Sequence, residues 1–120
     1  MNIALGLLGG WIAPSDSINV YNSTAIEFPP TPARIVTHVT LTINLIANGI
    51  TSGSPLINMT KNGLGIGGGS AVNFSSTTTP GVYTTGPIAT GSTSSSDTYG
   101  LEQTNSATGT ITFSAILALN

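Results

Sequence analysis

The clearest predicted strand runs from Arg34 to Ala47, and within it apolar and polar residues alternate from His38 to Leu45. Alternation with a period of two is the signature of an extended strand that buries one face. One face would carry Val39, Leu41, Ile43 and Leu45, and the other His38, Thr40, Thr42 and Asn44. Asn48-Gly49 follows and ends the pattern. We therefore predict a long strand with one face in the core.

A second alternating stretch closes the chain, from Thr110 to Leu119. One face consists of Ile111, Phe113, Ala115, Leu117 and Leu119. The opposite face begins with hydroxyl residues and becomes apolar at Ile116 and Ala118. Such a change predicts burial on both faces near the C-terminus, in a sandwich core or at a subunit contact. We therefore place a trimer contact at Ile116, Leu117 and Leu119.

Shorter β-favouring stretches are separated by Gly, Pro, Asn and Ser, and no helical period is visible. They are Ile18–Tyr21, Ala25–Phe28, Leu56–Thr60, Ala71–Phe74, Gly81–Thr85 and Thr98–Thr104. Asn62-Gly63 is the residue pair that favours a type I′ hairpin turn. Seven or eight short strands with turns between them predict an all-β fold, an antiparallel sandwich or jelly roll.

The first fourteen residues differ from the rest of the chain because they are rich in large apolar side chains. Those side chains are Ile3, Leu5, Leu7, Leu8, Trp11 and Ile12. The run is too short to span a bilayer and lacks the basic start of a signal peptide. We expect residues 1–14 to be either a docking arm or the first strand, and residues 15–120 to form one domain.

Charge is scarce: of 120 residues, two are Lys or Arg and four are Asp or Glu, whereas 33 are Ser or Thr. A hydroxyl-covered surface is cheaper to desolvate than a charged one, which favours packing against other subunits. So few basic residues also predict that neither nucleic acid nor an anionic membrane is a partner. There is no cysteine, which excludes disulfides and thiolate chemistry.

Little in the sequence points to catalysis. His38 is the single histidine, and it falls among threonines on the polar face of a predicted strand. The four carboxylates are isolated from one another, without the spacing of a calcium site or a glycosidase pair. Residues 63–68 match G-x-G-x-x-G, but no helix-forming segment follows, as a dinucleotide site requires. We expect no enzyme activity, no metal site and no cofactor.

Aromatic residues offer an alternative. Tyr21, Tyr83, Tyr99 and Trp11 could stack on a neutral sugar, with the loop Thr90–Ser96 supplying hydroxyls. We favour the other interpretation, in which these aromatic side chains are core residues and strand-end anchors. The carbohydrate hypothesis, with Tyr83 and Tyr99 as its glycan-binding residues, stays open from the sequence alone.

Three segments resemble the trimeric jelly rolls of the tumour-necrosis-factor and complement-globular-head type. Leu56–Gly63, which reads LINMTKNG, resembles their central strand and hairpin, and Thr98–Gly109 their penultimate strand and turn. Thr110–Leu119 resembles their closing strand, which in that family runs near the threefold axis. The family usually has more aromatic residues along that axis and more charge outside.

The resemblance implies a homotrimer. Because the chain starts at Met1 and leaves no room for a stalk, we expect a capsid cement, or decoration, protein of a bacteriophage. It would lie on the virion's capsid surface and bind the major capsid protein, with Ile3 to Ile12 as its docking arm. The alternative from another class is a carbohydrate- or receptor-binding head of a phage tail fibre or surface adhesin.

Overall fold

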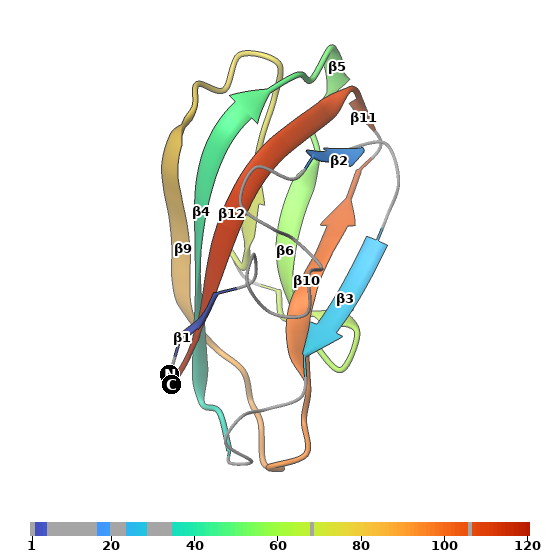
Figure 1. Ribbon diagram of the computed structural model, residues 1–120. Helices are drawn as coiled ribbons and strands as arrows, with labels where there is room; N and C mark the ends of the chain where they lie inside the picture. Colours follow the sequence, from blue (N-terminus) through green and yellow to red (C-terminus); the bar gives the residue numbers. More distant parts are fainter. Residues whose placement is uncertain (1, 5–16, 20–23, 29–34, 68, 106) are drawn as a thin grey trace.

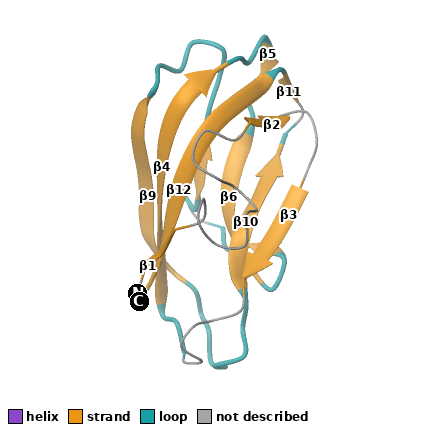
Figure 2. Cartoon of the chain, viewed as in Figure 1, coloured by secondary structure: helices purple, strands orange, loops and turns teal. Residues whose placement is uncertain are grey.

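The computed structural model describes residues 2–4, 17–19, 24–28, 35–67, 69–105 and 107–120. All regular structure in these residues is β-strand, as predicted (Figure 2). The strands are β1 (Asn2–Ala4), β2 (Ser17–Asn19), β3 (Thr24–Phe28), β4 (His38–Asn48), β5 (Ser52–Gly53), β6 (Leu56–Lys61), β7 (Leu64–Gly65), β8 (Ala71–Asn73), β9 (Gly81–Ala89), β10 (Tyr99–Thr104), β11 (Ala107–Thr108) and β12 (Thr110–Leu119).

Two five-stranded antiparallel sheets face each other (Figure 1). Sheet A has the order β1-β12-β4-β9, with β2 also pairing with β12. Sheet B has the order β3-β10-β6-β7, with β8 also pairing with β6. A small pair, β5 with β11, lies at one end of the molecule. The predicted antiparallel β-sandwich is confirmed.

The pairing of the strands is nested along the chain. The outermost partners are β1 and β2 with β12, followed inward by β3 with β10 and β4 with β9. The innermost partners are β6 with β7 and β8. The chain therefore crosses from one sheet to the other between β3 and β4, between β4 and β6, and between β8 and β9.

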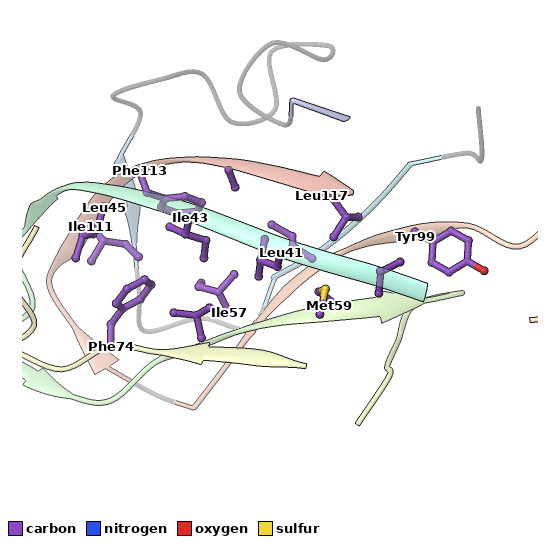
Figure 3. Close-up of a cluster of buried hydrophobic side chains, with 14 of the residues drawn as sticks. Leu41, Ile43, Leu45, Ile57, Met59, Phe74, Tyr99, Ile111, Phe113 and Leu117 are labelled. Carbon is purple, nitrogen blue, oxygen red and sulfur yellow. The ribbon is translucent and has the colours of Figure 1, made fainter. Parts of the chain in front are cut away.

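The core fills the space between the sheets (Figure 3). Sheet A contributes the inner residues of β4 and β12, all of which are buried: Val39, Leu41, Ile43, Leu45, Ile111, Phe113, Ala115, Leu117 and Leu119. Sheet B contributes Ile57, Met59, Tyr99 and Leu101, and Phe74 follows β8. The alternation in the two long stretches therefore predicted their inner faces correctly.

The hairpin between β6 and β7 also forms as predicted. Lys61 pairs with Leu64, which leaves Asn62 and Gly63 as a two-residue loop. Their φ angles are 53° and 82°, as a type I′ turn requires. Four very short strands, β1, β5, β7 and β11, had no clear sequence signal, because two or three residues carry no detectable period.

Candidate functional site

The outer face of sheet A is the most distinctive surface of the described residues. Ile116 of β12 pairs with Thr42 of β4, which pairs with Thr84 of β9. The hydroxyl oxygens of Thr42 and Thr84 are 3.2 Å apart. Ser114 and Asn44 form the next row. This face is built from short hydroxyl and amide side chains in a regular array.

Three large apolar side chains interrupt this polar array. Val82 is 69% exposed, Ile116 is 43% exposed and Ile46 is 39% exposed. Val82 pairs with Asn44, and Ile46 lies at the bulge where β12 shifts register between Thr112 and Phe113. Exposed apolar residues within a flat, easily desolvated face are typical of contact surfaces.

The strands of sheet A contain no Asp, Glu, Lys or Arg. Charged residues within the described ranges belong instead to the strands of sheet B or to the loop that leads into β10. They are Glu27, Lys61, Asp97 and Glu102. A contact made by the described strands of sheet A would therefore bury no charged side chain of those strands, and so would avoid the largest cost of forming an interface.

Glu102, one of the charged residues on the sheet B side, accepts a local hydrogen bond. The Asn58 amide donates to the Glu102 carboxylate at 3.3 Å, and the Ser70 hydroxyl donates to the Asn58 carbonyl oxygen. Gly65 lies so close that a Cβ there would collide with Asn58 Nδ2. Because its two hydrogen bonds hold Asn58 in place, glycine is favoured at this position of β7, which lies close to the Asn58–Glu102 pair.

The loop between β9 and β10 is fixed by a second polar cluster. The Asn62 amide donates to Asp97 Oδ1 at 2.9 Å, and the Ser92 hydroxyl donates to Asp97 Oδ2 at 2.6 Å. These two hydrogen bonds, with a smaller contribution from Lys61, hold the pKa of Asp97 below its usual value. The Lys61 ammonium donates to the Thr90 carbonyl at 3.1 Å. The Asp97 carboxylate and the Lys61 ammonium therefore both help to fix the loop between β9 and β10.

The three residues predicted at a trimer contact do not share a face. Ile116 lies on the outer face of sheet A, where a second subunit could reach it. Leu117 and Leu119 are 0% and 1% exposed and point into the core (Figure 3, Leu117). The prediction for Leu117 and Leu119 is corrected: they stabilise the sandwich and are inaccessible to another chain.

Of the predicted docking arm, Ile3 lies in β1, opposite Leu117 of β12. Leu5, Leu7, Leu8, Trp11 and Ile12 lie outside the described residues. Two strands flank this remaining part of the arm, since Ala4 pairs with Ile116 and Ser17 with Thr112 of the same strand. The first of the predicted arm residues therefore belongs to a strand at the edge of sheet A, and the others follow it along the chain.

The predicted glycan-binding tyrosines are poorly placed for stacking. Tyr99 is 1% exposed and points into the core between the sheets. Tyr83 is partly buried, packs edge-on against Phe74 with ring centroids 5.6 Å apart, and donates its hydroxyl to the Thr79 carbonyl. Tyr99 is therefore corrected to a core residue, and neither ring presents an open face of the kind a sugar needs.

His38 is exposed at the start of β4, where its Nδ1 lies 3.1 Å from the Thr37 hydroxyl. Within the described ranges no three His, Asp or Glu side chains gather as metal ligands. In the same part of the chain, no helix has the length and apolar character needed to cross a bilayer.

Sequence reasoning missed one unusual residue, Gln103 of β10. It is 3% exposed, and neither its amide nitrogen nor its carbonyl oxygen has a hydrogen-bond partner among the residues the structure describes. The alternation Tyr99, Leu101, Gln103 shares the inner face of β10 and could have revealed it. Burying an unpaired amide costs free energy, so we expect Gln103 to weaken the sandwich.

Comparison with known proteins gives no further guide. No protein-family model, no curated protein and no solved structure matches the chain significantly.

Proposed function

We propose that the chain is a non-enzymatic structural protein of a phage particle, a homotrimeric cement protein on the capsid surface. The observation that carries this proposal is the outer face of sheet A, which has no charge and exposes Ile46, Val82 and Ile116. Such a face suits permanent contact with other protein subunits, because little is lost when water leaves it.

The proposal also includes a jelly-roll topology. A jelly roll arises when a long antiparallel ribbon of paired strands wraps into two sheets. The nested pairing supports this topology, with β1 and β2 on β12 outermost and β6 with β7 and β8 innermost. The resemblance of Leu56–Gly63 and Thr110–Leu119 to trimeric jelly rolls leads to the same proposal.

Within the trimer, the outer face of sheet A is the contact between subunits. Ile116 lies near the middle of this sheet, flanked by β4 on one side and β1 on the other. A buried lysine at this position would be an unpaired charge in an apolar contact, which is strongly destabilising. Ile116→Lys is therefore the substitution that separates trimer formation from folding.

Attachment to the shell would involve the segment that follows β1. Its apolar residues would supply the surface that is buried against the major capsid protein; they are Leu5, Leu7, Leu8, Trp11 and Ile12. A protein that binds only the assembled shell stabilises the shell by its binding free energy, through mass action. No catalytic group is needed for this function.

Co-sedimentation with empty phage heads that lack the protein tests the proposal. We expect saturable binding by the wild-type trimer and much weaker binding by Ile116→Lys, because without the trimer the avidity of three linked sites is lost. Leu64→Lys adds the same charge on the sheet B side and is the matched control. Absence of saturable binding to any head by a folded trimer would overturn the proposal.

A further inference from the structure

The open edges of the two sheets are protected to different degrees. Exposed edge strands invite pairing with other chains, and proteins guard them by short length, by charge, by proline or by bulges. β1, β2, β7 and β8 are only two or three residues long. β3 carries Glu27. Among the described strands, β9 is the one long edge without a charge.

Only the second half of β9 has features that prevent pairing with a further strand. Gly86 and Pro87 lie opposite Thr40, where the register with β4 shifts. This bulge and the missing N–H of Pro87 disrupt any further pairing there. The first half, Gly81–Thr85, pairs with β4 in unbroken register and contains no proline or charge.

The outer edge of Gly81–Thr85 has no backbone hydrogen-bond partner among the described residues, although β8 lies near β9. In an antiparallel sheet, every second residue of an edge strand directs its N–H and C=O away from its neighbour. In the described ranges, no backbone hydrogen bond links residues 81–89 to a segment other than β4, although the Thr85 hydroxyl donates to the Gly69 carbonyl. Val82 is 69% exposed, and a Cβ at Gly81 would meet open space.

We propose that Gly81–Thr85 is a second self-association site, where β9 pairs antiparallel with β9 of another copy across a twofold axis. A strand paired with itself in this way needs only one kind of edge. With the axis at Tyr83, Val82 of one copy lies opposite Thr84 of the other. Apolar and β-branched cross-strand pairs of this kind stabilise antiparallel sheets.

The absence of charge decides in favour of a second copy as the occupant. Two identical charged strands would place like charges in adjacent positions, which opposes pairing. Val82, Tyr83 and Thr84 carry none, and valine, tyrosine and threonine are strong strand formers. The pairing would join sheet A of one copy to sheet A of the next as one continuous sheet.

This edge contact uses the backbone of β9, whereas the proposed trimer contact uses the outer side chains of sheet A, to which Val82 also belongs. The two contacts together would link trimers into a network, because each subunit then has a threefold and a twofold neighbour. The edge is tested in the Ile116→Lys background, where association through the face of sheet A is removed. If the trimer proposal is wrong, Ile116→Lys by itself will not abolish the trimer. If the edge proposal is wrong, the charges added at residues 82 and 84 will not change the association of the Ile116→Lys protein.

Two opposite pairs of charges form the experiment, Val82→Lys with Thr84→Lys and Val82→Glu with Thr84→Glu, each in the Ile116→Lys background. Sedimentation equilibrium over a wide concentration range gives the mass, and hydrogen exchange follows the amides of Gly81–Thr85. We expect the background protein to form dimers as its concentration rises and each charged variant to stay a monomer. Mixing the two variants should restore a dimer, because opposite charges then face each other across the axis.

Hydrogen exchange supplies the direct readout of backbone pairing. The outward amides of Gly81–Thr85 should exchange more slowly as the concentration of the background protein rises, and the charged variants should lose this dependence. The proposal is overturned if the background protein stays monomeric up to its solubility limit with concentration-independent exchange. It is also overturned if dimers form but the mixed charged variants do not re-associate.

Discussion

The two outer faces of the sandwich differ in how they treat charge. On the sheet B side, Glu102 accepts a hydrogen bond from the Asn58 amide of the neighbouring strand β6, and Asp97 accepts hydrogen bonds from Asn62 and Ser92 in the adjoining turn and loop. On the sheet A side, the strands have no Asp, Glu, Lys or Arg. Ile116 and Val82 are exposed there among short polar side chains, most of them threonines. The described charges on the sheet B side that have printed partners find them within one subunit, whereas the uncharged strands of sheet A suit contact with another subunit.

Within sheet A, the inner side of a strand lies in the core and the outer side faces away from it, yet both sides can be apolar. A strand such as β12 has an inner residue, Leu117, next to an outer residue, Ile116, and both are apolar. The same composition therefore serves folding on one side and suits assembly on the other. Substitutions that separate these two roles test whether the comparison is real.

The largest expected effect is on the inner side of β12. Leu117→Ala should lower the free energy of unfolding by about 2–5 kcal/mol, because it leaves a cavity in a fully buried site. Ile116→Ala, one residue away, should change it by no more than about 0.5 kcal/mol in the monomer. Urea denaturation at low protein concentration measures both. Equal losses would contradict the assignment of the two faces.

Gln103 offers a change in the opposite direction. Gln103→Met removes two unpaired polar atoms at nearly constant volume and should raise the free energy of unfolding by about 1–3 kcal/mol. Gln103→Glu is the control, which should destabilise the protein because a buried carboxylate costs more than an amide. If Gln103→Met destabilises the sandwich in urea denaturation, the amide has a partner in solution.

Acid should affect the two regions differently. The pKa of Asp97 is lowered from its ordinary value of 3.8, so its contribution to stability is present above that value and is lost as the pH falls through the lower folded value. Amide exchange at Ser92 and Thr98 should accelerate in this range and not at Thr42. Asp97→Asn should remove the acid transition; an unchanged transition would point to another group.

The smallest expected effect concerns salt. Association through a face without charges should change little in affinity between low and high ionic strength, because there is no charge pair to screen. Sedimentation at two salt concentrations measures it. A strong weakening in salt would mean that charged residues such as Lys61 or Glu102 take part in the contact.

Much of this architecture could be predicted from the sequence, because β4 and β12 alternate so regularly and Asn62-Gly63 defines a turn. The roles of the apolar residues near the C-terminus could not be predicted from the sequence in the same way. The alternation placed Ile116 and Leu117 on opposite faces of the strand, but Leu117 and Leu119 were still assigned to a subunit contact, which needs exposed side chains, and the structure buries both. For Tyr99 the sequence left two roles open, since an aromatic residue at a strand end suits either a core or a surface, and its burial supports the favoured core role.

Sedimentation equilibrium of three proteins tests the central claim, that the chain associates through the outer face of sheet A. At a concentration too low for the smaller β9 edge contact, we predict a trimer for the wild type and a folded monomer for Ile116→Lys. Leu64→Lys should remain a trimer, because its changed residue is 75% exposed on the sheet B side. Charge added at a trimer contact is costly, and charge added in water is not. A wild-type monomer, or a trimer that survives Ile116→Lys and is lost with Leu64→Lys, would contradict the claim.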